Sequence, residues 1–281
     1  TNSATQNITV NINNLNDNSP SITSSSTFTV DENQTAIGQV TATDTDDNNL
    51  SYSISSPDIV IDPSSGQLAF TSSPDYEAIK SYSALVNVSD GNNSASQLIT
   101  VNINNLNDNA PSFTSNATFT ADENQTAIGT VEVIDADGDD ITFSISGSEI
   151  NIDTSTGVLT FASAPDYETK SSYTATVTAS DGTNSTTQDI TVNINNLNDN
   201  SPSFSSSPSF NVDENQTLIG TVIATDGDGD SITYAISGSE INIDASTGVL
   251  TFASAPDYET KSNYTATVTA SDGTNSATQD I

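Results

Sequence analysis

The chain repeats itself every 91 residues, and this period limits the folds that it can adopt. Four short motifs, DEN, PDYE, SDG and NDN, each occur three times, and successive copies of each motif are 91 residues apart. The DEN copies begin at residues 31, 122 and 213, and the PDYE copies begin at 74, 165 and 256. Such self-similarity is typical of tandem units arranged along one chain. The 281 residues therefore predict three copies of one unit.

Within each repeat the apolar residues alternate with polar residues, which predicts β-strands. In the first repeat Leu50, Tyr52 and Ile54 alternate with serines. Alternation over short runs rich in Val, Ile, Thr and Tyr indicates half-buried strands. The predicted strands lie at 28–30, 37–42, 50–54, 59–61, 66–70, 82–88 and 97–103. Seven short strands in a repeat of 91 residues predict an all-β chain of tandem immunoglobulin-like, seven-stranded Greek-key β-sandwiches joined end to end.

The period also predicts the domain boundaries. Residues 1–18 would hold the last strand and linker of a preceding repeat, 19–109 and 110–200 would form two complete repeats, and 201–281 would form a third repeat without its last strand. The first eight residues, TNSATQNI, nearly match the last eight, TNSATQDI. Two interpretations remain open. The chain is either a window of a longer array or a subunit whose first segment completes the last repeat of a neighbouring copy by strand donation.

The net charge limits the partners of the chain. The sequence has 37 Asp and Glu but 3 Lys, no Arg and no His, for a net charge of −34. Such a field repels nucleic acid and anionic membranes and attracts divalent cations. Only 33% of the residues are hydrophobic, but their regular placement argues against disorder. The absence of Cys excludes disulfides and thiol chemistry, and no apolar run is long enough to span a membrane.

Acidic and amide side chains gather at the predicted strand ends and loops. In the second repeat these residues are Glu123, Asp135, Asp137, Asp166, Glu168, Asp181 and the asparagine-rich linkers on either side. Because the loops of a sandwich cluster at its two ends, these side chains can converge at the junctions between repeats. Two carboxylates about 4 Å apart repel by roughly 1 kcal/mol in water and by about 4 kcal/mol at an effective dielectric constant of 20. A bound cation would remove this repulsion.

The donor set favours Ca²⁺. This ion binds about six to eight oxygens from carboxylates, carbonyls and amides. The absence of His and Cys disfavours zinc, copper and nickel, and Mg²⁺ prefers fewer protein ligands. The DGDGD sequence at 226–230 is not an EF-hand loop, because Ser231 and Ser237 stand where Gly and Glu are needed. Solvated acidic loops are the alternative, which the threefold recurrence of the whole set disfavours.

In their order along the chain, these motifs resemble the cadherin repeat. The Glu of DEN is similar to the first-strand glutamate of that family, DTD, DAD and DGD to its D-x-D, PDYE to its D-x-E, SDG to its late single Asp, and NLNDNAP to its linker. The resemblance covers essentially the whole chain, and the near-identical copies look like the cadherin-like arrays of prokaryotic surface proteins. It implies an extracellular, cell-surface chain of calcium-binding sandwiches joined by rigidified linkers.

The resemblance also implies a set of Ca²⁺ ligands at each junction. At the 14–18 linker these are Asn14, Asn16, Asp17, Asn18, Asp44, Asp46 and Asp90. At the 105–109 linker they are Glu32, Asp75, Glu77, Asn105, Leu106, Asn107, Asp108, Asn109, Asp135, Asp137 and Asp181. At the 196–200 linker they are Glu123, Asp166, Glu168, Asn196, Leu197, Asn198, Asp199, Asn200, Asp226, Asp228 and Asp272. A last set, Glu214, Asp257 and Glu259, has no following linker in the chain.

The linker departs from the family pattern at its first position. Asn14, Asn105 and Asn196 stand where the family has an acid, and we expect the lost charge to weaken one of the ions. The chain also has no Trp, so an exchange of aromatic anchors between molecules is not supported.

The function predicted from these features is that of a calcium-stiffened extracellular stalk, adhesin or surface-filament segment. Its expected partners are calcium ions and neighbouring repeats, with no nucleic acid and no membrane insertion. An open alternative is that the repeats themselves contact a glycan or another array; Tyr76, Tyr167 and Tyr258 are candidates, although packing at the junction also explains them. Catalysis is not expected, because paired carboxylates suit glycoside hydrolysis but the same pairs recur in every repeat, without His, Cys or Arg.

Overall fold

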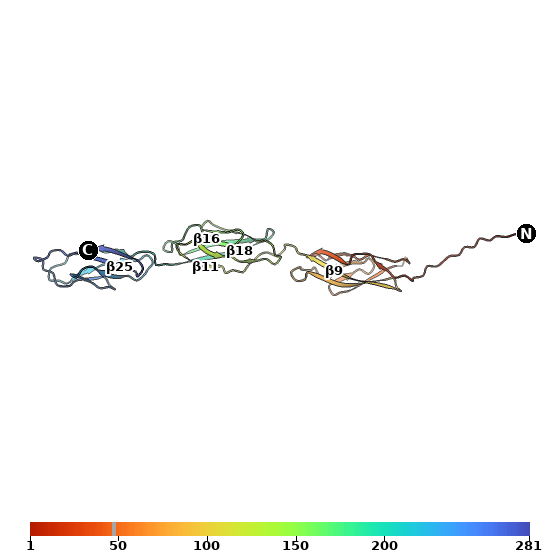
Figure 1. Ribbon diagram of the computed structural model, residues 1–281, viewed down its shortest axis with the longest axis horizontal. Coiled ribbons are helices and arrows are strands. Elements are labelled where there is room, and N and C mark those ends of the chain that lie inside the picture. Colours follow the sequence, from red (N-terminus) through yellow and green to blue (C-terminus); the bar gives the residue numbers. More distant parts are fainter. Residues whose placement is uncertain (47–48) are drawn as a thin grey trace. The chain divides into compact units, whose positions relative to one another are not determined.

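The computed structural model describes residues 1–46 and 49–281, and these residues form β-strands without any helix (Figure 1). The described residues divide into two compact units. The first unit comprises Thr1–Pro111, Ile134–Ile141 and Ser180–Ser185, and the second comprises Ser112–Val133, Thr142–Ala179 and Thr186–Ile281. No helix in the described residues has the length and apolar character needed to cross a membrane. The prediction of an all-β chain is confirmed.

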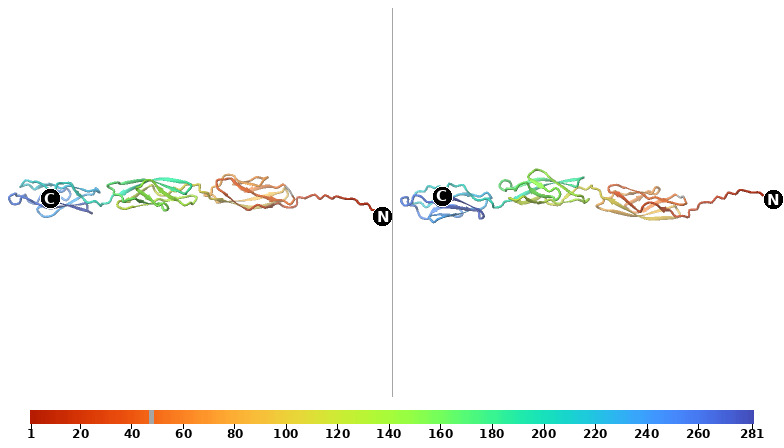
Figure 2. Two further views of the ribbon diagram at one scale, coloured as in Figure 1. Left: turned by 90° about the horizontal axis from the view of Figure 1, so that it is seen from above. Right: turned by 45° about the horizontal axis from the view of Figure 1, so that its top comes forward.

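The first unit contains a sandwich of two main sheets (Figure 2). The four-stranded sheet has the order β2 (Thr27–Asp31), β9 (Ser94–Asn104), β8 (Ser81–Ser89) and β5 (Ser51–Ser55). The three-stranded sheet has the order β3 (Ala36–Gln39), β7 (Gln67–Phe70) and β6 (Ile59–Ile61), and β1 (Ser21–Ile22) pairs with β4 (Ala42–Thr43). β2 runs parallel to β9, whereas the other pairs are antiparallel. Each of the seven predicted strands overlaps one of these strands, which confirms the immunoglobulin-like sandwich.

The core of this sandwich follows from the alternation of the sequence. Val86, Val88, Ile99 and Val101 occupy every second position of β8 and β9 and have no exposed surface. They pack in one cluster with fully buried residues of the other sheet, such as Leu68. Burial of each of these side chains contributes about 1.5–3 kcal/mol relative to exposure. Hydrophobic burial therefore holds the two sheets together and leaves the polar residues at the loops.

A glycine at the same place in each repeat allows a tight loop before β7 and before the corresponding strands of the other two repeats. Gly66, Gly157 and Gly248 have φ angles of 75°, 70° and 71°. A Cβ atom at these positions would lie 2.3 to 2.5 Å from the carbonyl oxygens of Val40, Val131 and Val222. Only glycine fits such a backbone without strain. This explains why the GQL and GVL sequences recur with the 91-residue period.

The second repeat has the same strands as the first. They are β10 (Ser112–Phe113), β11 (Thr118–Asp122), β12 (Ala127–Thr130), β13 (Val133–Ile134), β14 (Thr142–Ile145), β15 (Ile150–Ile152), β16 (Val158–Phe161), β17 (Ser172–Ser180) and β18 (Ser185–Asn195). The sheets have the orders β11-β18-β17-β14, β12-β16-β15 and β10-β13. As in the first repeat, the first long strand, β11, runs parallel to the last strand, β18.

The third repeat keeps most of these strands, but its last two strands are shorter than those of the second repeat. Its strands are β19 (Ser203–Phe204), β20 (Leu218–Thr221), β21 (Ala224–Thr225), β22 (Thr233–Ile236), β23 (Ile241–Ile243), β24 (Val249–Phe252), β25 (Thr267–Ser271) and β26 (Ser276–Asp280). β26 forms the first five residues of the last strand of this repeat and pairs with β25. Residues 209–213 form no strand, and no strand that pairs with them lies among the described residues.

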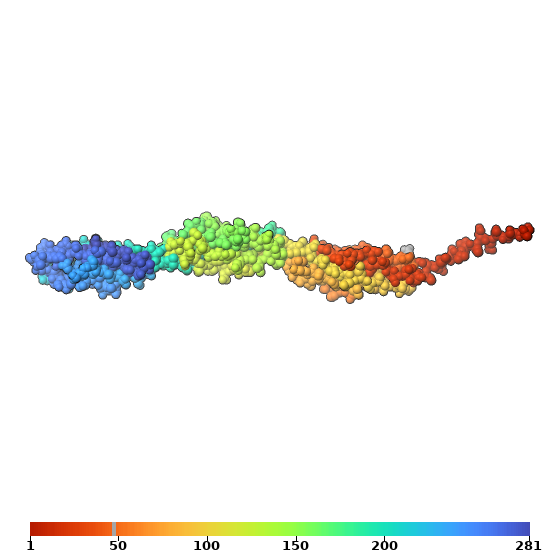
Figure 3. Space-filling model, viewed as in Figure 1, coloured from red at the N-terminus to blue at the C-terminus, as the bar shows by residue number. Residues whose placement is uncertain are grey.

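The N-terminal segment, residues 1–18, forms no strand either. Ile8, Val10 and Ile12 would occupy inward positions of a last strand, but 84%, 80% and 92% of their surfaces are exposed. The segment stands free of other parts of the chain in Figure 3. A single strand without neighbours cannot satisfy its backbone hydrogen bonds or bury its apolar face. The predicted strand within residues 1–18 is therefore absent here, and the four-part division of the chain remains a proposal.

Candidate metal centres

In the first unit, a buried glutamate ties the 105–109 linker to the first sandwich. Glu32 is 3% exposed and belongs to the DEN turn, where Asn33 adopts a positive φ angle of 64°. Asn is one of the few residues that adopt this conformation readily. The Glu32 carboxylate accepts hydrogen bonds from the backbone N–H groups of Tyr76 at 2.7 Å and Leu106 at 2.9 Å. The DEN, PDYE and linker motifs therefore meet at one carboxylate.

Asp137 binds the same linker from the loop at 135–141. Its Oδ2 accepts hydrogen bonds from the backbone N–H groups of Asp108 at 3.0 Å and Asn109 at 2.8 Å, and its Oδ1 accepts one from the Asn109 side chain at 2.8 Å. Burial raises the pKa of Asp137, but these hydrogen bonds lower it by more, so that the pKa lies below its ordinary value. Asp137 is thus held as an anion against the linker backbone.

Asp181 approaches the linker from the loop at 180–185. Its Oδ1 accepts hydrogen bonds from the backbone N–H groups of Thr183 at 2.7 Å and Asn184 at 2.6 Å. The Asn184 side chain donates to Asn107 Oδ1 at 3.1 Å, and the Asn107 side chain donates to the Asp181 carbonyl at 3.3 Å. The third residue of the linker is therefore held between two groups of one loop.

The carboxylates around this linker lie close enough to share cations. Oxygens of Glu32, Asp75 and Glu77 lie within 4.8 Å of one another, as do oxygens of Glu77, Asp108 and Asp137. Two oxygens on one Ca²⁺ lie at most about 5 Å apart, because each is about 2.5 Å from the ion. Burial, followed by the nearby Glu32 charge, raises the pKa of Glu77. The neighbouring carboxylates therefore add to the cost of the negative charge on Glu77.

Several carboxylate oxygens in the loops are buried without a hydrogen-bond partner. Among the described residues, Oδ2 of Asp44, Asp135, Asp181, Asp226 and Asp272 has this property. Buried polar atoms are nearly always satisfied, so a recurring exception calls for a group that the protein does not supply. A cation satisfies an anionic oxygen directly. The donor set therefore fits an oxygen-binding metal ion.

The second unit repeats the arrangement at the 196–200 linker. Glu123 is 2% exposed and accepts hydrogen bonds from the backbone N–H groups of Tyr167 and Leu197, both at 2.7 Å. Asp228 accepts hydrogen bonds from the backbone N–H groups of Asp199 at 3.0 Å and Asn200 at 2.9 Å. Oxygens of Glu123, Glu168 and Asp199 lie within 4.8 Å of one another.

Two sets of predicted ligands lie where only half of a junction is present. Asp46 accepts hydrogen bonds from the Asn18 and Asp17 backbone N–H groups at 2.8 and 3.0 Å, and the Asn18 bond is the largest cause of its lowered pKa. Asn14, Asn16 and Asp90 lie at the same junction, where the Asn14 side chain donates to the Asp46 carbonyl at 2.8 Å and the Asn16 side chain to the Asp90 carbonyl at 3.3 Å.

At the other end of the chain, Glu214, Asp257 and Glu259 form an exposed cluster with oxygens within 4.8 Å of one another. Glu214 accepts a hydrogen bond from the Tyr258 backbone N–H at 3.2 Å. Tyr258 is 67% exposed, whereas Tyr76, its counterpart in the first repeat, packs against the buried core. The tyrosine of the PDYE motif therefore packs against the core in the first repeat, where a linker follows, and is exposed in the third repeat.

The structure adds residues that the motif analysis missed. Asn93, Asn184 and Asn275 are the second residue after each SDG motif, and each side chain donates to oxygens of the preceding linker. Their recurrence with the 91-residue period is the feature of the sequence by which they could have been identified. Asp139 was also missed, although an oxygen of this residue lies within 4.8 Å of oxygens of Asp135 and Asp137. Burial, and then Asp135, raises the pKa of Asp139.

Comparison with known proteins shows the family to which these repeats belong. The cadherin domain family matches residues 26–104, 117–195 and 208–280. Cadherin EGF LAG seven-pass G-type receptor 2 of Mus musculus is 33% identical over 236 residues, which cover 75% of this chain and 8% of that protein. Protocadherin Fat 4 of Mus musculus is 33% identical over 297 residues, which cover 94% of this chain and 6% of that protein. The chain thus spans a small part of the relatives that it matches.

A solved structure shows the same fold. The crystal structure of mouse Cadherin-23 EC22-24 matches with a TM-score of 0.73 at 24% sequence identity, and the match covers 94% of this chain and 98% of that chain. Because the curated relatives include a seven-pass receptor and protocadherins, the extracellular, cell-surface location expected from the resemblance is confirmed. With three cadherin domains matched over most of its length, the chain belongs to the cadherin family.

Proposed function

We propose that the linkers of this chain bind Ca²⁺ and that the segment serves as a calcium-stiffened spacer in an extracellular adhesion protein. The observation that supports this proposal most strongly is the set of buried carboxylate oxygens that have no partner among the described residues, at Asp135 and Asp181 beside the 105–109 linker and again at Asp226 and Asp272. An ion at each position would satisfy these oxygens and neutralise the carboxylates that face them.

The residues at each junction would act as ligands and as supports. Glu77 and Asp108 would supply charged oxygens from one side, and Asp135 and Asp181 would supply them from the other. Glu32 and Asp137 would also hold the linker backbone through their hydrogen bonds. Because these ligands come from the linker and from loops of two repeats, a bound ion would restrain the bending of the linker. The same set recurs at each junction, which suits a structural role better than catalysis.

Calcium titration of the chelator-treated chain tests this proposal. We expect calorimetry to detect more than one bound Ca²⁺ per chain, with dissociation constants near those of extracellular modules, about 10⁻⁴–10⁻³ M. Asp181→Asn should weaken binding, because it removes a charged ligand. Asp153→Asn is the matched control, because Asp153 accepts similar backbone hydrogen bonds in a loop outside the clusters. The proposal is wrong if Ca²⁺ does not bind at millimolar concentration, or if both variants bind like the parent chain.

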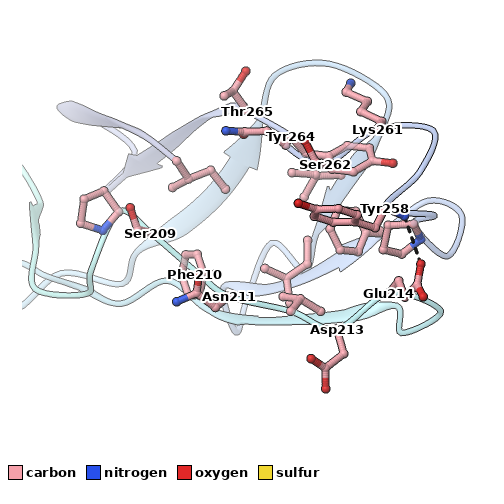
Figure 4. Close-up of a pocket in the computed structure, with 18 residues that line it drawn as sticks. Ser209, Phe210, Asn211, Asp213, Glu214, Tyr258, Lys261, Ser262, Tyr264 and Thr265 are labelled. Atoms are coloured by element: carbon pink, nitrogen blue, oxygen red, sulfur yellow. Dashed lines mark hydrogen bonds between the residues drawn. The ribbon is translucent and has the colours of Figure 1, made fainter.

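We also propose that the segment associates with a second copy of itself, and a groove in the third repeat supports this proposal. A cavity of about 660 Å³ lies beside residues 209–213, with Phe210, Ile241, Phe252 and Tyr264 in its lining (Figure 4). In the first repeat the corresponding space holds Val101 and Ile103 of β9, which are 0% and 5% exposed. The groove therefore has the position of the last strand.

The N-terminal segment has the sequence that this groove would accept. Residues 8–14 read ITVNINN, which is identical to 99–105 and 190–196. Ile8, Val10 and Ile12 are largely exposed. Their burial in the groove of another copy would stabilise the complex by about 0.8 kcal/mol per buried methylene. The added strand would also supply backbone partners to residues 209–213 and place the 14–18 linker beside Glu214, Asp257 and Glu259.

Light scattering coupled to gel filtration tests this association in the 281-residue segment. We expect concentration-dependent, head-to-tail oligomers in Ca²⁺ and their loss in Val10→Asp, because a carboxylate would enter the apolar groove. Asn11→Asp is the matched control, because its counterpart Asn102 is exposed on the outer face of β9. Association would be excluded if the parent segment stays monomeric at high concentration, or if both variants associate equally.

A further inference from the structure

We propose that the outer face of the four-stranded sheet in the first repeat is a docking surface for a second copy of this chain, which binds through the same face. The surface is centred on Leu85 of β8 and Leu98 of β9, the two central strands of the sheet. This contact differs from the strand addition proposed above, because it joins the outer faces of two folded repeats and requires neither the N-terminal segment nor Ca²⁺.

The first support is a pair of exposed leucines that contact each other on this face. Leu85 and Leu98 are cross-strand partners, and 47% and 62% of their surfaces are exposed. They lie on the side of the sheet away from the core, because the residues that follow them, Val86 and Ile99, have no exposed surface. Scattered apolar residues are normal on a protein surface, so the contrast with the other two repeats decides whether this pair is significant.

The other two repeats have a polar, charged pair at these positions. In the second repeat the Thr176 hydroxyl donates a hydrogen bond to Asp189 Oδ1 at 2.7 Å. In the third repeat Thr267 and Asp280 form the same bond at the same distance. The corresponding strands of the second repeat have the same lengths as β8 and β9, so the fold does not require leucines here. The apolar pair is therefore a property of the surface of the first repeat.

The residues around the leucine pair are short and uncharged. Ser55 lies beside Leu85 on β5, and Asn87 and Ser96 form the next cross-strand pair, in which Ser96 Oγ donates to Asn87 Oδ1 at 3.1 Å. Among the outward residues of these four strands, all of which the structure describes, Asp31 at the end of β2 is the only charged one and none is aromatic. Short side chains let a second sheet approach to about 10 Å, the ordinary spacing of packed sheets.

The charge of the chain favours a second copy as the partner. A basic partner would be attracted to faces that carry carboxylates, whereas this face has none near its centre. A second copy carries the same net charge of −34 and is repelled wherever carboxylates meet. In a two-fold contact, residues near the axis meet their own copies, so Asp189 at the equivalent face of the second repeat would oppose another Asp189. Leu98 replaces this repulsion with an apolar contact, which makes the face complementary to itself.

Sedimentation equilibrium of the Val10→Asp chain in chelator tests this contact, because neither strand addition nor a shared Ca²⁺ then contributes. We expect an equilibrium between monomer and dimer that stops at the dimer, since a two-fold contact closes. Association should increase in high salt, which screens the charges of the two copies. The double change Leu85→Thr/Leu98→Asp should weaken the dimer by about tenfold or more, because it places carboxylates in the apolar contact. This variant should keep its fold, since the second repeat folds with the same pair.

Val60→Asn in the same Val10→Asp chain is the matched control. Val60 is 49% exposed on β6, a strand of the three-stranded sheet, and Asn151 and Asn242 occupy its position in the other two repeats. This variant should form the dimer as the Val10→Asp chain does. The inference is overturned if the Val10→Asp chain stays monomeric at millimolar concentration, if it forms open-ended oligomers, or if the leucine changes and Val60→Asn have equal effects. None of these outcomes concerns Ca²⁺ binding, so failure of this inference and failure of the proposed function are distinguishable.

Discussion

Removal of Ca²⁺ by a chelator is expected to lower the melting temperature of this chain by about 10 °C or more. A ligand present at 100 times its dissociation constant stabilises the folded state by about 2.7 kcal/mol per site. A change of 1 kcal/mol in the free energy of unfolding shifts the melting temperature of a domain the size of one repeat by about 4–8 °C. Without the ion, carboxylates such as Glu77, Asp108 and Asp137 also repel one another.

Calorimetric melting with and without Ca²⁺ measures this effect, and solution scattering measures its mechanical consequence. If ions restrain the linkers, the maximum dimension in scattering should fall on chelation, because the linkers can then bend. Mg²⁺ at equal concentration is the control and should restore less stability, since it prefers fewer protein ligands and keeps its waters. An unchanged melting temperature and an unchanged maximum dimension would contradict the role as a calcium-stiffened spacer.

Glu123→Ala is expected to destabilise the second repeat by about 2–4 kcal/mol even without Ca²⁺, because it leaves two backbone donors without an acceptor. The carboxylate is 2% exposed and accepts from Tyr167 and Leu197. Glu123→Gln should cost less, since its amide keeps one acceptor oxygen. Urea unfolding in the presence of a chelator measures both free energies of unfolding.

A matched control for this variant is Glu149→Ala. Glu149 forms an ion pair with Lys170 at 2.6 Å, but the Glu149 side chain is 56% exposed. An exposed ion pair contributes about 0–1 kcal/mol, so this variant should unfold nearly like the parent chain. Equal losses for Glu123→Ala and Glu149→Ala would show that the hydrogen bonds of Glu123 to the backbone do not hold the linker. In Ca²⁺, the difference between the two variants should widen, because Glu123 also lies in the carboxylate cluster.

The seven strands were predictable because their signal is local. Alternation at Leu50, Tyr52 and Ile54 places one face inward whatever the rest of the chain does, and β5 (Ser51–Ser55) forms there. The acidic groups were also predictable as a set, because their motifs recur with the period of the repeat. Glu32 and Asp137 do lie beside the linker that follows the first repeat.

Prediction was poorer where a strand depends on a partner far along the chain. Residues 8–12 have the same sequence as 99–103, yet only the latter form a strand, because β2 and β8 lie on either side of it. The third repeat shows the converse, since residues 209–213 match a strand pattern but have no parallel neighbour among the residues that the structure describes. Hydrogen-bond pairing in a sheet is a property of both strands, so the pattern of one strand does not determine it.

The sequence by itself determined the period, the sandwich fold, the strongly acidic junctions and the position at which the linker has Asn105 instead of an acid. Only the tertiary structure decided what those side chains do. It shows that the Asn105 side chain donates to the Asp137 carbonyl, that the Asp139 N–H donates to Asp135 Oδ1, and that the other oxygen of Asp135 is buried with no partner in the described part of the chain. The physical reason is the range of the interactions. The face on which a strand residue lies depends on its neighbours in sequence, whereas the hydrogen bonds of a carboxylate depend on every group that the fold brings next to it.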